Sequence, residues 1–325
     1  MLNQKKLEIA LKKYTKNFQK SSFYEDSKEQ YEDIKSILSE IIDLNDTKRD
    51  HILLISIGTI FTYYNSVWKE DVFSLENKQI EGLKMMQISL FYQCIAQDLY
   101  KIRYPRMMVI YTFKEVVAAL IHFTMYGWEK EETILFDFIV KHLGENSMSA
   151  NDWNKHTWFL LELYLQYRKK TIFEIDQHVN ISVKEKMKES EMKYALIPEN
   201  LDIYSGVLES WSTPIEEEIT ALIGQMINYH SELASELGKS IEFGDYRYGF
   251  YPYEILFLLH VRKKKGLPVP QHFEELLMNT PEAQMVFQEP EPYPEQDPLL
   301  VQIDRFYRKN YPDYFLNQYG EELFQ

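Results

Sequence analysis

Three carboxylates near the C-terminal third of the chain are the side chains best placed for chemistry. Glu242, Asp245 and Glu254 lie close together in the sequence. Paired carboxylates can serve as general acid and base, or they can hold a hard cation. A histidine from a neighbouring helix, His230 or His260, would complete such a site. The spacing therefore allows a helical enzyme, with or without a metal ion.

A structural role for the same carboxylates is the favoured interpretation. Asp245 stands in a turn-forming context, where an aspartate commonly accepts hydrogen bonds from nearby backbone N–H groups. Glu254 has two arginines close by in the sequence, Arg247 and Arg262, and either one can neutralise it. Such pairing leaves no group free for catalysis.

Catalytic and metal-binding signatures are absent from the sequence. None of the eight histidines is followed by Glu or Asp, and none has an acidic residue three positions before it. These patterns exclude the common zinc-protease, His-Asp phosphohydrolase and di-iron bundle signatures. The sequence Gly238-Lys239-Ser240 resembles the end of a P-loop, but it follows a helical pattern and lacks the first glycine. Cys94 is the only cysteine and lies in an apolar helical pattern, so no catalytic residue, metal or cofactor is predicted.

The elements that must position these groups are helices. Apolar residues recur at helical spacing along most of the chain, and strand-like alternation is nearly absent. Only 11 glycines occur in 325 residues, which also disfavours turn-rich β folds. We predict an all-α array of antiparallel helix pairs with little or no β-structure. The expected helices cover residues 3–19, 29–44, 48–68, 77–101, 105–126, 129–143, 151–169, 213–237, 252–264, 271–287 and 297–309.

A charge-rich run between the two halves suggests a domain boundary. The segment KEKMKESEMK has few apolar positions and is typical of a solvated helix or linker. We therefore expect an N-terminal helical domain over residues 1–180. A C-terminal helical domain over residues 200–325 would carry an aromatic turn, IEFGDYRYGFYPY, and an acidic, proline-rich segment.

The net charge of −14 restricts the classes of partner. Nucleic-acid binding normally requires a basic face, so no nucleic acid is expected. No secretory signal is evident, and the longest apolar runs are too short to cross a membrane, so we expect a cytoplasmic protein. From Gly266 to Asp304 the chain has eight Asp or Glu and no Lys or Arg. This region is either a solvated covering or a negative face that docks a basic partner.

The C-terminal third also resembles a known family. The stretches DYRYGFYPYEILFLLHVRKKKGLPVP, LLMNTP and EPYPEQDPLL are similar to the C-terminal part of immunity proteins from bacterial polymorphic toxin systems, such as the PoNi family. In that group an aromatic-glycine turn leads into a helix that carries a glutamate, here Tyr246–Phe250 and Glu254. A proline-rich segment and a closing helix follow, here Pro290–Leu300. The segment AALIHFTMYGWEKEE is a looser match in the N-terminal half.

The resemblance implies a cytosolic all-α antidote that binds one cognate toxin domain and performs no chemistry. A toxin nuclease is basic around its cleft, and an acidic inhibitor can occupy that cleft. The residues expected to contact the toxin are Glu242, Asp245, Tyr246, Tyr248, Glu289, Glu291, Tyr293 and Asp297. A helical hydrolase-like or metal-binding enzyme and a helical scaffold or regulator remain the alternatives. Homodimer formation stays open.

Overall fold

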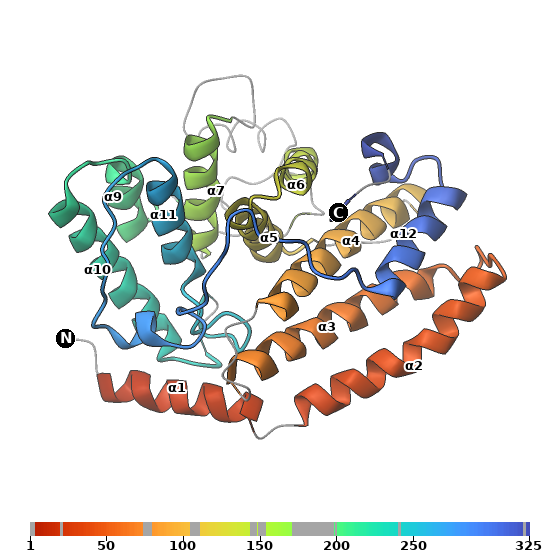
Figure 1. Cartoon of the computed structure of the whole chain (residues 1–325), viewed down its shortest axis with the longest axis horizontal. Helices are drawn as coiled ribbons and strands as arrows, with labels where there is room; N and C mark the ends of the chain where they lie inside the picture. The colour runs from red at the N-terminus through yellow and green to blue at the C-terminus, as the bar shows by residue number, and fades with distance from the viewer. Residues whose placement is uncertain are drawn as a thin grey trace. The chain divides into compact units, whose positions relative to one another are not determined.

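The structure is a computed structural model in which the chain is helical. It describes residues 4–19, 22–73, 80–104, 111–143, 148, 154–170, 198, 200–239, 242–320 and 323–325. Within these ranges the regular structure consists of α-helices and short 3₁₀ turns, with no strand (Figure 1). The all-α prediction is therefore confirmed. No helix among the described residues combines the length and apolar character needed to span a membrane.

The chain forms two compact units, and each is assembled from three chain segments. Unit 1 comprises residues 1–17, 112–121 and 140–286, and unit 2 comprises residues 18–111, 122–139 and 287–325. This division differs from the predicted one, which placed a single boundary between residues 180 and 200. Most of the residues around that boundary, 171–197 and 199, lie outside the described part of the chain. The two divisions differ because helices that are far apart in the sequence pack their apolar faces against one another.

Unit 1 holds the aromatic turn and the helices packed around it. Its main helices are α7 (Lys155–Arg168), α9 (Ile203–Ser210), α10 (Glu216–Ala234) and α11 (Tyr253–Lys264), together with most of α1 (Gln4–Gln19) and the first part of α5 (Phe113–Tyr126). Helix α9 packs against α7 and α10, and α11 also contacts both (Figure 1). The turn between α10 and α11 lies within this packing, so its polar side chains face neighbouring helices.

Unit 2 is built on a long helical hairpin. Helices α3 (His51–Phe73) and α4 (Glu81–Arg103) pack along each other, and α2 (Phe23–Asp43) packs along α3. The approach of α3 and α4 is close at Gly82, where an added Cβ would lie 2.4 Å from the backbone nitrogen of Trp68. The remaining described elements are most of α6 (Glu129–His142), α12 (Pro298–Asn310) and the 3₁₀ turn η3 (Phe315–Tyr319).

Two local expectations were wrong. The helix predicted over residues 271–287 is only a 3₁₀ turn, η2 (Leu276–Asn279), because Pro281 interrupts the helical pattern. Helix α10 begins at Glu216 and not at residue 213 as predicted; the Thr213 hydroxyl accepts a hydrogen bond from the backbone N–H of Ile215 at 3.2 Å in the turn before the helix. The predicted helix starts near residues 105 and 151 fall outside the described residues.

Candidate functional site

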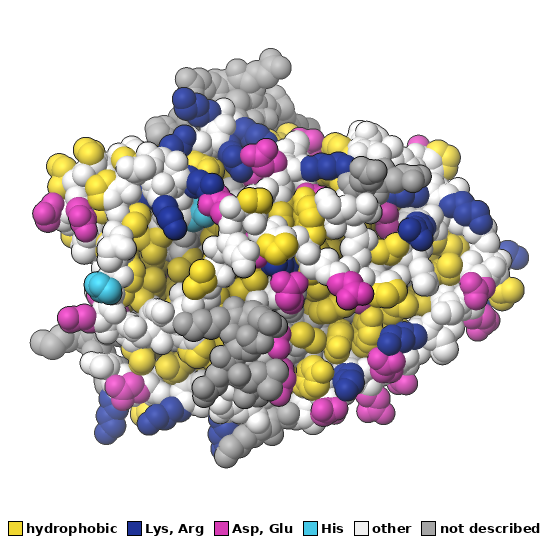
Figure 2. Space-filling model, in the orientation of Figure 1, with side chains coloured by type: hydrophobic (Ala, Val, Ile, Leu, Met, Phe, Trp, Pro, Cys, Tyr) yellow, Lys and Arg dark blue, Asp and Glu magenta, His cyan; other side chains and the backbone are white. Residues whose placement is uncertain are grey.

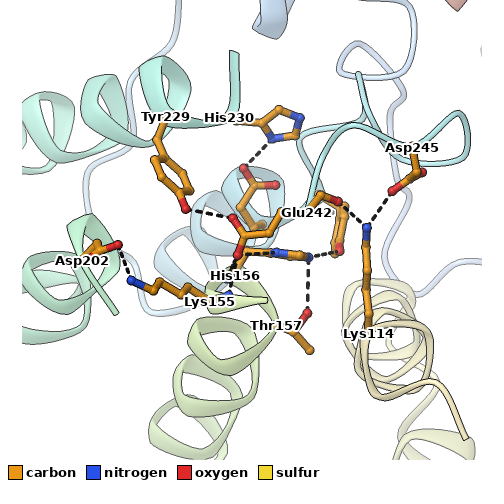
Figure 3. A network of polar contacts seen from close by, with 11 residues as sticks. Lys114, Lys155, His156, Thr157, Asp202, Tyr229, His230, Glu242 and Asp245 are labelled. Atoms are coloured by element: carbon orange, nitrogen blue, oxygen red, sulfur yellow. Dashed lines mark hydrogen bonds and ion pairs between the residues drawn. The ribbon is translucent and has the colours of Figure 1, made fainter. Parts of the chain in front are cut away.

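A network of polar side chains in unit 1 contains the carboxylates and one histidine singled out in the sequence (Figure 3). The aromatic turn between α10 and α11 supplies Glu242 and Asp245, α11 supplies Glu254, and α7, α10 and α5 supply the partners. Gly249 allows the turn to fold on itself, since an added Cβ would lie 2.4 Å from the carbonyl oxygen of Asp245. The turn therefore depends on glycine at this position.

Glu242 is a buried carboxylate that accepts several hydrogen bonds. Its side chain is 5% exposed. Oε2 accepts from the hydroxyl of Tyr229 at 2.9 Å, and Oε1 accepts from the backbone N–H groups of Lys155 and His156. Burial raises the pKa of Glu242, but His156 and these donors outweigh burial and hold the pKa below its usual value. Glu242 thereby ties the turn to the first turn of α7.

His230 and Glu254 form a pair in the interior. His230 Nδ1 lies 2.8 Å from Glu254 Oε1, and both side chains are 0% exposed. His230 Nε2 lies 3.0 Å from the carbonyl oxygen of Gly249, which can only accept, so Nε2 carries a proton. The hydrogen bond between Nδ1 and Oε1 then holds a single further proton. The imidazole ring stacks on Phe243 with 3.7 Å between ring centroids.

His156 is held in a similar way from α7. Its Nε2 lies 2.9 Å from the hydroxyl of Tyr253, and its Nδ1 lies 3.5 Å from Glu242 Oε1. Burial lowers the pKa of His156 and outweighs the opposing influence of Glu242. The imidazole is therefore neutral at neutral pH.

Asp245 caps the turn, as the structural interpretation expected. Its Oδ1 accepts from the backbone N–H groups of Arg247 and Tyr248, each at 2.7 Å. Its Oδ2 accepts from Lys114 Nζ at 2.7 Å, and the same ammonium donates to the carbonyl oxygen of Glu242. Burial raises the pKa of Asp245, but Lys114 and the two backbone donors keep it below its usual value.

The predicted pairing of Glu254 with an arginine was wrong. Arg247 pairs instead with Glu115, and Arg262 donates to the carbonyl oxygens of Pro268 and Trp211. His230 takes the place of the arginine. His260 lies apart from the carboxylates; burial, with Lys264, Arg168 and Lys263, lowers its pKa to about 4.

The residues that sequence reasoning missed in this network are Lys114, His156 and Tyr229. Lys114 and His156 each stand in the first turn of a strongly apolar helix. A polar residue at the start of such a helix can have a buried partner, but the sequence does not identify the partner. Tyr229 has no signal of its own among the many tyrosines of the chain.

Two of the predicted contact residues in unit 1 lie in the interior. Tyr248 and Glu242 are buried, and both belong to the folded turn described above. Asp245 and Tyr246 keep part of their surface exposed. Tyr246 stacks on Tyr14 with 6.1 Å between ring centroids.

Two of the predicted contact residues in unit 2 are also internal. Glu291 is 5% exposed and pairs with the buried Lys84 ammonium at 2.9 Å. Asp297 is buried and caps α12, where Oδ1 accepts from the backbone N–H groups of Leu299 and Leu300. The Oδ2 of Asp297 accepts from two tyrosine hydroxyls of α2 and α3.

The other two residues predicted in unit 2 reach the surface. Glu289 is exposed, and Tyr293 is partly exposed while its hydroxyl donates to Glu131 at 3.0 Å. The acidic region from Gly266 to Asp304 is therefore less exposed than the sequence predicted. Four of its eight acids are buried, and a sequence count does not separate caps and ion pairs from solvated charges.

The buried network joins four helices, α5, α7, α10 and α11, to the turn. Its imidazole and carboxylate groups are of the kinds that transfer protons. However, His230 and Glu254 bond to each other away from solvent, so a substrate would reach them only after the helices separate. Among the described residues, no group of three or more His, Cys, Asp or Glu is placed to hold a metal ion. Comparisons of the chain with models of protein families, with curated proteins and with solved structures found no match.

Proposed function

We propose that this chain is an immunity protein that binds one cognate toxin domain and blocks it stoichiometrically. One observation carries the proposal: the acid–base pair of His230 and Glu254 is bonded together in the interior, while many other carboxylates of the described residues face solvent. Such an arrangement suits recognition of a basic macromolecule better than turnover of a small substrate. The resemblance of the C-terminal third to immunity proteins supports the same function.

The outer face of α2 is the surface that we propose for the toxin. The helix contains seven acidic residues and two lysines. Figure 2 shows acidic side chains along the lower right edge of the molecule, where Figure 1 places this helix. Its exposed acids are Glu25, Asp26, Glu29, Glu32, Asp33, Glu40 and Asp43. Glu32 pairs with Lys35 and Glu40 with Arg49, yet the helix as a whole remains negative.

A negative helix face has a defined effect on binding. Opposite charges steer two proteins together and raise the association rate, and salt screens the attraction. The residues of the predicted contact set that reach the surface, Asp245, Tyr246, Glu289 and Tyr293, add further candidate contacts. Glu242, Tyr248, Glu291 and Asp297 are removed from the proposed surface, because a buried side chain offers no contact area.

The test uses the product of the neighbouring gene. An immunity gene lies directly beside the gene for its toxin, so the C-terminal domain encoded next to this chain is the partner to co-express and co-purify. We expect a one-to-one complex and survival of cells that produce both proteins. If the purified neighbour does not bind this chain, the proposed function is wrong.

Two matched charge reversals then locate the surface. The first changes Glu25, Glu29 and Asp33 of α2 to lysine. The second changes Glu216, Glu217 and Glu232 of α10 to lysine; all six side chains are exposed, and both variants change the net charge equally. We expect association to slow by about tenfold or more in the α2 variant at low salt and to change much less in the α10 variant. Equal effects in both variants would exclude α2 as the contact surface and leave the binding function intact.

A further inference from the structure

A hollow in unit 2 has a composition unlike the rest of this acidic chain. Its volume is about 780 Å³, within the range of small-molecule pockets. Its lining comes mainly from α12 and from Asn317, Gly320, Leu323 and Gln325. The lining residues used below are Tyr92, Val301, Arg305, Arg308, Lys309 and Leu323.

Among the described lining residues, positive charges outnumber negative ones. Asp304 also lines the hollow, but Arg308 Nε donates to it at 2.7 Å and balances its charge. Arg305 and Lys309 are exposed side chains on the same face of α12. Neither of these two cations forms an ion pair within the described part of the chain. Among the described residues, two cations without an ion-pair partner therefore line one hollow of a protein whose net charge is −14.

A mostly buried tyrosine lines the same hollow. Tyr92 is only 6% exposed, and its ring packs against Phe91 and Phe324 with centroid distances of 5.5 and 5.8 Å. Its hydroxyl makes no hydrogen bond to any described residue. The hydroxyl itself keeps access to solvent, so it is able to donate to a molecule bound in the hollow.

We propose that the hollow binds a small organic anion, a carboxylate or a phosphate ester. The guanidinium of Arg305 and the ammonium of Lys309 would take the charged group, since both donate charge-assisted hydrogen bonds to such oxygens. The hydroxyl of Tyr92 would donate to a further oxygen. Val301 and Leu323 would contact the carbon skeleton. This site lies within unit 2 and does not depend on the proposed toxin binding.

Calorimetric titration of the full chain with two probes tests the site. Citrate represents the carboxylates, and adenosine monophosphate represents the phosphate esters. We expect at least one probe to bind with a dissociation constant below about 1 mM at low salt. Failure of both probes to reach that affinity overturns the proposal.

Three variants separate the site from a general charge effect. Arg305→Gln with Lys309→Gln is expected to weaken binding by about tenfold or more. Lys28→Gln with Lys48→Gln removes the same charge from exposed positions elsewhere in unit 2 and is expected to retain the affinity. Tyr92→Phe removes only the hydroxyl and is expected to weaken binding several-fold at an unchanged urea midpoint. Equal affinity in the Arg305/Lys309 variant and the wild type, or equal loss in the Lys28/Lys48 control, would overturn the proposal.

Discussion

Replacing Glu254 by alanine is the sharpest perturbation of the buried network. Its partner His230 is 2.8 Å away, and both side chains are 0% exposed. Removing one member of a buried pair typically costs about 3–5 kcal/mol, because the remaining polar group keeps its burial and loses its partner. Glu254→Gln keeps the shape and a hydrogen bond to Nδ1, so we expect a loss of only about 1 kcal/mol.

Urea unfolding followed by tryptophan fluorescence measures the difference between these two variants. Trp158 and Trp211 lie in unit 1 and report on its unfolding. With a urea dependence of about 2 kcal/mol per molar, the alanine variant should unfold about 2 M earlier than the wild type, and the glutamine variant about 0.5 M earlier. A loss below about 1 kcal/mol for alanine would refute the reasoning, since the pair would then contribute little to holding α10 and α11 together.

Three further predictions concern the turn, the last helix and acid stability. Gly249→Ala should destabilise unit 1 by about 2 kcal/mol or more in urea unfolding, because the new Cβ would lie 2.4 Å from the carbonyl oxygen of Asp245; an unchanged midpoint would contradict this. Asp297→Ala should cost about 2 kcal/mol or more in unit 2, because a helix cap and two tyrosine hydroxyls lose their acceptor. Asp297→Asn should recover part of that loss. Burial lowers the pKa of His260 to about 4, so the unfolded chain binds a proton below about pH 6.5 that the folded chain binds only near pH 4. Stability should fall by up to about 3 kcal/mol as the pH drops through this window, and His260→Gln should flatten that part of the profile in urea unfolding at several pH values.

The local sequence pattern predicted the fold well where helices are long and apolar. Helices α3 and α4 were placed within a few residues, because their length and apolar content leave little choice. The short helix Ile203–Ser210 was not predicted, since eight residues give a weak periodic signal. The division into two units was not predictable from composition, because it depends on which distant helices share a core.

The sequence predicted several residues of the candidate site, but it did not predict which of them pair. The sequence drew attention to Glu254 and His230, and the structure joins them. An arginine was the predicted partner of Glu254 because two arginines lie near it in the sequence. In the fold, α10 places His230 against Glu254 instead. Glu291 and Asp297 were expected at the surface because acidic residues usually lie there. Their burial depends on Lys84 and on the start of α12, which only the packing reveals.

A direct functional control follows from the central claim that this chain acts by binding. If the pair of His230 and Glu254 is structural, Glu254→Gln should fold and protect cells from the neighbouring toxin as the wild type does. A folded Glu254→Gln variant that binds the toxin but fails to protect would instead assign chemistry to the carboxylate. The urea midpoint and the co-purification yield of the same preparation provide the controls.

Titration of the purified toxin domain with the purified chain tests that claim most directly. Residual toxin activity should fall in proportion to the added chain and reach its floor at one equivalent, with wild type and Glu254→Gln giving the same end point. Loss of toxin activity at amounts of chain far below one equivalent, growing with incubation time, would show turnover and contradict the account.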